Sequence, residues 1–152
     1  MTQDFIPHEM ISHSDWLFIE GYLLLDPAQV SAVKESIMVA RNNGLKIAVT
    51  LATVAVMDVA FDHLAEEIIG HVDLIVGNED EYRALIKAAE HYKHEAAELL
   101  AQKLQSTPRL VTHGEKGASF LDSDGNKTFE PCPPVAAVSY THLRAHETPR
   151  QL

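Results

Sequence analysis

The chain has 152 residues, of which 46% are hydrophobic, and its formal net charge is −10. This length suffices for one domain with a core of its own, and the acidic balance disfavours binding to nucleic acid or to anionic membrane, which both need basic surface. Cys132 is the single cysteine, so no disulfide can form within the chain. With no signal peptide and no apolar run long enough to span a bilayer, we expect a soluble cytoplasmic protein.

Apolar strands and amphipathic helices alternate along the first part of the chain. Trp16–Ile19 is a continuous apolar run of the kind found in buried parallel strands. Asp26 and Pro27 predict a helix start, because Asp caps free N–H groups and Pro suits the first helical position. Gly44 is expected to end this helix in a left-handed conformation, and Lys46–Leu51 is the second predicted strand.

The same alternation continues after the second strand. Asp58 is predicted to cap a helix that Gly70 closes, and the third strand covers Leu74–Val76. Two further helices are predicted, a short one from Glu79 to about Ala88 and another over Glu95–Gln105.

The predicted strands end with a hairpin. Leu110–Thr112 is the fourth strand, and Ala118–Leu121 with Lys127–Glu130 forms a hairpin around Gly125. Strands that alternate with helices predict βαβ units. We therefore expect a three-layer αβα fold of the α/β class, with four mainly parallel core strands and helices on both faces of the sheet.

Asn78 and Glu81 follow the third strand at a spacing that has two interpretations. Asn is a preferred N-cap and Glu three residues later completes a capping box, which explains both residues without a ligand. A helix N-terminus at a strand end also favours phosphate, and Glu81 could hold Mg²⁺ through water. The two interpretations are compatible.

The stretch Val111–Ala118 carries two glycines three residues apart, Gly114 and Gly117. Such a pair is typical of a hairpin turn, and it also suits a turn whose N–H groups bind an anion. Ligands of parallel sheets bind at the carboxyl ends of the strands. We therefore expect Asn78 and Gly114 to border one crevice.

The histidines do not predict a metal centre. His91 and His94 lie three residues apart, but no H-E-x-x-H or Cys/His pattern accompanies them, so a solvated polar face is favoured over zinc. His113 lies inside the glycine stretch, where it contacts a nucleotide or faces water.

Both motifs resemble those of the ribokinase-like (PfkB-type) family of carbohydrate and nucleoside kinases. Val111–Ala118 resembles the family's V-T-x-G-x-x-G-A segment, which lies along the ATP phosphates, and Asn78–Glu81 resembles its N-x-x-E, which organises magnesium and phosphate. The resemblance implies a ribokinase-like fold, with ATP and Mg²⁺ as cofactors. The implied ATP-binding residues are Thr112, Gly114, Lys116 and Gly117, and the implied Mg²⁺ residues are Asn78 and Glu81.

The implied reaction transfers the γ-phosphoryl group of ATP to a hydroxyl of a small-molecule sugar or nucleoside. Many sugar kinases of the family carry Asp-Pro-Asn after the second strand, and residues 49–54 lack it, which favours the adenosine-kinase-like branch. The alternatives are a non-catalytic α/β nucleotide-binding or regulatory module, and another doubly wound enzyme with chance motif matches. The oligomeric state is left open.

The resemblance covers Ser14–Val135, the middle of a family member. The family's G-A-G-D motif, whose aspartate is the catalytic base, would begin shortly after Ala137 and has no counterpart here. No catalytic residue is therefore assigned, and we expect the chain by itself to be inactive.

Residues 138–152 differ in kind from the rest of the chain. Val138–Thr148 resembles the translation of a transposase-type sequencing adapter. We therefore expect residues 1–137 to form a partial kinase domain and residues 138–152 to be an artefactual, disordered tail.

Overall fold

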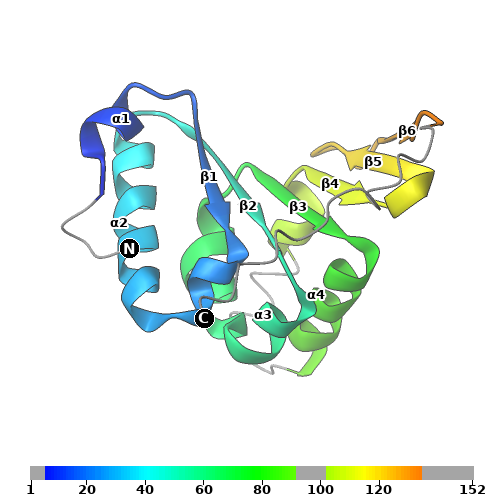
Figure 1. The fold of residues 1–152 in the computed structure, drawn as a ribbon, viewed down its shortest axis with the longest axis horizontal. Helices are drawn as coiled ribbons and strands as arrows, with labels where there is room; N and C mark the ends of the chain where they lie inside the picture. The colour runs from blue at the N-terminus through cyan, green and yellow to red at the C-terminus, as the bar shows by residue number, and fades with distance from the viewer. Residues whose placement is uncertain (1–5, 92–101, 135–152) are drawn as a thin grey trace, which may run out of the picture.

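The computed structural model describes residues 6–91 and 102–134, which form a six-stranded sheet in the order β1-β2-β3-β4-β5-β6 (Figure 1). β1 to β4 are parallel, and β5 and β6 continue the sheet as an antiparallel hairpin. The strands are β1 (Trp16–Glu20), β2 (Lys46–Thr50), β3 (Leu74–Asn78), β4 (Arg109–Thr112), β5 (Gly117–Leu121) and β6 (Lys127–Pro131). The predicted strands and the hairpin are confirmed.

Helical segments connect the parallel strands. They are α1 (His8–Ser12), η2 (Gly21–Leu25), α2 (Pro27–Asn42), α3 (Val54–Val59), η3 (His63–Ile68), η4 (Ile69–His71), α4 (Glu79–His91) and η5 (Gly114–Lys116). Residues 102–106 are also helical. Within the described residues, no helix is both long and apolar enough to cross a membrane.

The boundaries of α2 follow from its flanking residues, as predicted. The carboxylate of Asp26 accepts a hydrogen bond of 3.0 Å from the N–H of Ala28, and Pro27 is the first helical residue. After the helix, Gly44 has a φ of 74°. Its left-handed conformation ends the helix with little steric cost because glycine has no Cβ.

The prediction for Asp58 is wrong. α3 begins four residues earlier, at Val54, and its N-cap is Thr53, whose hydroxyl accepts a hydrogen bond from the N–H of Ala55 at 3.5 Å. Asp58 therefore lies within α3. The apolar stretch after it forms the π-helix η3 and the short 3₁₀ segment η4, and Gly70 lies inside η4. Part of the predicted helix Glu95–Gln105 lies outside the described residues.

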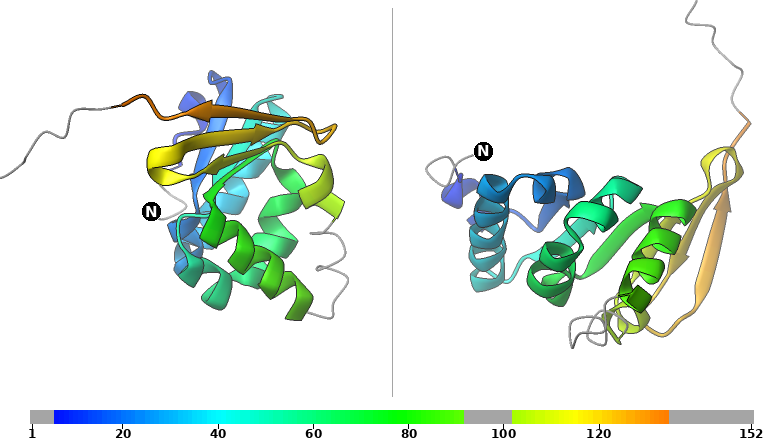
Figure 2. Two further views of the ribbon diagram at one scale, coloured as in Figure 1. Left: turned by 90° about the vertical axis from the view of Figure 1, so that its right-hand side faces the viewer. Right: turned by 90° about the horizontal axis from the view of Figure 1, so that it is seen from below.

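The crossover helices α2, α3 and α4 cover the same face of the sheet. Figure 2 shows α2, α3 and α4 on one side of the strands, whereas the sequence predicted helices on both faces. The strand order explains this difference. When each parallel strand is placed beside its predecessor in one direction, right-handed crossovers bring every helix to the same side. On β1, Ile19 is buried toward the helices, while Trp16 and Phe18 alternate to the other face and are 50% and 55% exposed.

Asp122 organises the turn between β5 and β6. Its carboxylate accepts hydrogen bonds from the side chain and the N–H of Asn126 and from the N–H of Asp124, each at 2.9 Å. The bond from the Asn126 side chain, followed by those from the backbone, lowers the pKa of Asp122 below its ordinary range. The ionised carboxylate therefore stabilises this turn.

Gly117 is required by the pairing of β5 with β6. Its φ is 122°, and a Cβ at this position would lie 2.0 Å from the carbonyl oxygen of Glu130. Gly114 also has a positive φ, 60°, but a Cβ there would meet nothing within 4 Å. The hairpin thus excludes a side chain at Gly117, while the space beside Gly114 is open.

We expect Asp122→Ala to reduce the dependence of hairpin stability on pH. Because the folded-state pKa is lowered, the stabilisation is complete above the unfolded pKa of about 3.9 and is lost as the pH falls through the lowered value. The measurement is amide exchange of β5 and β6 over acidic pH in the natural chain and the variant. Asp124→Asn is the matched control, and an equal pH dependence in the natural chain and Asp122→Ala would contradict the role of this carboxylate.

The two glycines should respond differently to alanine. Gly117→Ala should lower the free energy of unfolding by more than about 3 kcal/mol, because the new Cβ would strike the backbone of β6 in a conformation that side chains rarely adopt. Gly114→Ala should cost only about 1 kcal/mol, since the left-handed conformation is strained but no atom is in the way. Urea denaturation measures both values, and similar losses would show that the clash is relieved by movement of β6.

Candidate functional site

Asn78 and Glu81 form a reciprocal capping box at the start of α4. The N–H of Asn78 donates to Glu81 Oε2 at 3.0 Å, and its side-chain amide donates to Glu81 Oε1 at 2.8 Å. In return, the N–H of Glu81 donates to Asn78 Oδ1 at 2.9 Å. Glu81 is only 8% exposed, so the box holds a buried carboxylate at the N-terminus of the helix. The capping interpretation is therefore correct.

The glycine turn lies at the same end of the sheet as this box. In the parallel pairing of β3 with β4, Asn78 lies opposite Thr112, and Gly114 follows two residues later. Both motifs thus lie at the carboxyl ends of neighbouring strands, and the crevice between them stays a prediction. Thr112 and Lys116 are exposed there.

The turn offers two free backbone donors. The N–H of Lys116 donates to the carbonyl of His113 at 3.3 Å, and the N–H of Gly117 donates to the carbonyl of Gly114. Within the described residues, no acceptor takes the N–H groups of Gly114 and Glu115. These are the first two residues of the 3₁₀ turn η5, which lack partners inside the turn. Beside the exposed ammonium of Lys116, they can bind an anion.

The helix end and the turn differ in charge. The first turn of α4 carries Glu79, Asp80 and Glu81, and three carboxylates oppose a bare phosphate even though the helix dipole favours one. The glycine turn carries Glu115 and Lys116, whose formal charges cancel, together with the two free N–H groups. At the helix end, Arg83 pairs with Asp80, which leaves two carboxylates there without a cationic Lys or Arg partner among the described residues. Of the two places, the turn therefore suits a phosphate better, and the helix end suits a cation.

The residues present suit Mg²⁺ only with additional ligands. Across residues 6–91 and 102–134, no three His, Cys, Asp or Glu side chains come together as a metal site. Each Glu81 oxygen accepts one hydrogen bond inside the box and retains a further lone pair. Mg²⁺ usually keeps several waters and binds one or two carboxylates together with substrate phosphates. Glu81 fits that pattern through water.

His113 has contacts that the sequence did not predict. Its Nδ1 lies 3.0 Å from Glu79 Oε1, and its Nε2 lies 2.7 Å from the hydroxyl of Ser119. The side chain is only 12% exposed, so the alternative that it faces water is wrong, while contact with a nucleotide stays a prediction. Strand alternation offered a signal: because Thr112 points to one face, the next residue points to the other, where α4 lies.

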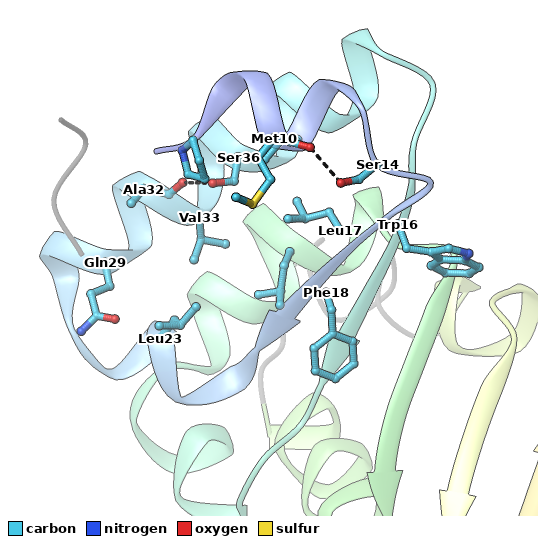
Figure 3. Close-up of a pocket in the computed structure, with 13 residues that line it drawn as sticks. Met10, Ser14, Trp16, Leu17, Phe18, Leu23, Gln29, Ala32, Val33 and Ser36 are labelled. Carbon is cyan, nitrogen blue, oxygen red and sulfur yellow. Dashed lines mark hydrogen bonds between the residues drawn. The ribbon is translucent and has the colours of Figure 1, made fainter. Parts of the chain in front are cut away.

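An apolar cavity of about 290 Å³ lies at the opposite edge of the sheet, between α1, α2 and β1. Figure 3 shows Met10, Leu17 and Val33 converging on it. Its serines are already bonded locally, because Ser14 Oγ donates to the carbonyl of Met10 and Ser36 Oγ to that of Ala32, both at 2.8 Å. Neither serine hydroxyl is therefore free to meet a ligand's polar atoms, and the glycine turn remains the candidate site.

Some predicted features cannot be compared with the structure. His94 and the tail Val138–Leu152 lie outside the described residues, and the contacts of the His91 side chain are not described.

Comparison with known proteins agrees with the family resemblance. The family model for the pfkB family carbohydrate kinases matches residues 2–141, which includes residues 138–141 of the tail. A search of curated protein sequences finds no match.

Solved structures show the same fold. Adenosine kinase from Sinorhizobium meliloti has a TM-score of 0.71 and 20% identity over 91% of this chain and 41% of its own. Anopheles gambiae adenosine kinase, in complex with P1,P4-di(adenosine-5) tetraphosphate, has a TM-score of 0.72 and 16% identity over 89% of this chain and 45% of its own. An E. coli protein assigned as ribokinase II, in complex with ATP and Mg²⁺, has a TM-score of 0.70 and 20% identity over 90% of this chain and 44% of its own.

The chain thus spans less than half the length of each of these proteins. The likeness confirms the ribokinase-like α/β fold, and the family match covers nearly all of the sequence. The chain belongs to the pfkB family of carbohydrate kinases.

Proposed function

We propose that this chain is the phosphate- and magnesium-binding part of an ATP-dependent kinase that phosphorylates a hydroxyl of a sugar or nucleoside. The observation that carries the proposal is the register of β3 with β4, in which Asn78 lies opposite Thr112. This register brings an acidic helix N-terminus and a glycine turn with free N–H groups to one end of the sheet. Phosphoryl transfer depends mainly on such positioning and charge neutralisation.

The glycine turn would bind the ATP phosphates. The N–H groups of Gly114 and Glu115 and the ammonium of Lys116 supply the donors, and Thr112 adds a hydroxyl beside them. Gly114 leaves open space where a phosphate can approach the backbone. Gly117 would contribute indirectly, since its missing Cβ allows β6 to hold the turn in place.

Glu81 would hold Mg²⁺ through water, with Asn78 fixing the carboxylate. When bound, Mg²⁺ supplies positive charge that neutralises the phosphates. Burial and three hydrogen bonds in the capping box keep Glu81 in one orientation. The E. coli protein in complex with ATP and Mg²⁺ supports this pair of cofactors.

A nucleoside of the adenosine type is the favoured acceptor. Two structural relatives are adenosine kinases, and residues 49–54 lack the Asp-Pro-Asn of many sugar kinases. The chain itself is proposed to be inactive, because no residue within it is assigned as the base that removes the acceptor's proton.

We expect the chain to show no phosphorylation of sugars or nucleosides with ATP and Mg²⁺. Loss of general-base help alone lowers rates by about two to four orders of magnitude. The comparison is with a version restored through the G-A-G-D motif and its N-terminal part, for which adenosine should be a better acceptor than ribose or fructose. Comparable turnover by both proteins would contradict the missing base, and a restored protein without kinase activity would contradict the kinase function.

Replacement of one carboxylate by an amide should separate capping from Mg²⁺ binding. Glu81→Gln should leave the melting temperature nearly unchanged, because Gln also completes a capping box. It should reduce the Mg²⁺-dependent part of ATP affinity about tenfold, as loss of a residue that orients metal-bound water does.

Calorimetric titration of the chain with ATP, in Mg²⁺ and in EDTA, measures this effect. Asp80→Asn is the matched control, since Asp80 lies in the same helical turn but outside the box. An equal loss in both variants would indicate a general charge effect, and no loss in Glu81→Gln would exclude Glu81 from the Mg²⁺ site.

A further inference from the structure

The imidazole of His113 connects three elements around the glycine turn. Glu79 is the first residue of α4, Ser119 lies in β5, and the ring of Phe129 in β6 lies 6.0 Å from the imidazole, centre to centre. Ser119 is 1% exposed. One side chain thus joins the acidic helix end to the hairpin that carries the turn.

The hydrogen-bonding chemistry of these partners decides which ring nitrogen carries the proton when the imidazole is neutral. A carboxylate only accepts hydrogen bonds, so Nδ1 carries the proton that is donated to Glu79. Nε2 is then the acceptor, and the hydroxyl of Ser119 donates to it. Both ring nitrogens and the buried hydroxyl are therefore satisfied, and this fixes the orientation of the imidazole.

The main chain of His113 is part of the turn itself. Its N–H donates to the carbonyl of Gly117 at 2.8 Å, and its carbonyl accepts from the N–H of Lys116 at 3.3 Å. An imidazole held at both nitrogens restrains the residue from which the turn starts. The position of the N–H groups of Gly114 and Glu115 consequently depends on the contacts that the His113 side chain makes on the face of the sheet covered by α4.

We propose that His113 is a positioning residue that holds the glycine turn in register with the first turn of α4. The inference rests on the proposed function, because it concerns the spacing between the phosphate-binding turn and Glu81. The side chain does not touch the phosphates. It acts through Glu79 on the helix and through Ser119 on the hairpin.

The first experiment needs no ligand. Amide hydrogen exchange at Lys116 and Gly117, measured by NMR, should become about tenfold faster in His113→Ala, because two hydrogen bonds are lost and the Ser119 hydroxyl loses its partner. His113→Gln can replace one of the two contacts, so its amide exchange rates should lie between those of the unsubstituted chain and His113→Ala. The control is His71→Ala, in η4 before the amino-terminal end of β3, which should leave both amides unchanged.

A double-mutant cycle tests whether the effect passes through Glu79. Glu79→Ala, which removes the acceptor of the Nδ1–H bond, should speed exchange of the turn amides when His113 is present and have no effect in the His113→Ala background. Exchange in β1 and β2 should stay constant throughout, which distinguishes a local effect from global unfolding. Equal effects of Glu79→Ala in both backgrounds would overturn the proposed connection.

The second readout is ATP affinity in the presence of Mg²⁺, measured by calorimetry. His113→Ala should weaken ATP binding about tenfold. The affinity of His113→Gln should lie between those of the unsubstituted chain and His113→Ala. Unchanged turn amides in His113→Ala, or disturbed amides with unchanged affinity, would overturn the positioning role. If the natural chain binds no ATP, the proposed function fails, whereas the exchange results and the cycle still decide whether His113 fixes the turn.

Discussion

The register between β3 and β4 determines which groups meet at the candidate site. Asn78 lies opposite Thr112, and α4 begins at the residue after Asn78. The N-terminus of the helix is therefore fixed at the sheet edge from which the glycine turn extends. A shift of this pairing by one residue would place each side chain of β4 on the other face. His113 would then lie away from α4, and Thr112 would take its place.

Local features of this arrangement could be predicted because their cause lies within a few residues. Three helix-end signals act on backbone groups within one helical turn. They are Asp26 with Pro27, Gly44, and the pair Asn78 and Glu81. The same locality explains the error at Asp58. Thr53 is an equally suitable cap, and the choice between them depends on which residues of the following helix become buried.

Features that depend on strand order could not be predicted from residues that are close together in the sequence. The alternation of strands and helices is compatible with crossovers on one face or on both, and only the order β1-β2-β3-β4 decides between them. The partners of His113 are likewise brought together by the sheet, because Glu79 lies 34 residues away along the chain. Strand alternation could have indicated the face on which His113 lies, but not its partners.

The face of the sheet without crossover helices is also apolar. Trp16, Phe18 and Phe120 are 50%, 55% and 41% exposed, and they lie on this face according to the strand register. Parallel sheets are normally covered on both sides, and exposed apolar surface of this kind is usually covered by other protein. The structural relatives have more than twice the length that this chain matches. Among the described residues, the crossover helices thus form one layer on the sheet, and the opposite face presents these exposed aromatic side chains.

A net charge of −10 places a condition on how this chain could bind ATP. The long-range field repels an anion, so affinity must come from short contacts at one place. Backbone N–H groups are well suited to this, because they contribute positive partial charge at fixed positions without a flexible side chain. The acidic first turn of α4 would oppose the phosphates unless a cation lay between them. Under the proposed function, the carboxylates in the first turn of α4 would therefore favour ATP with Mg²⁺ over free ATP.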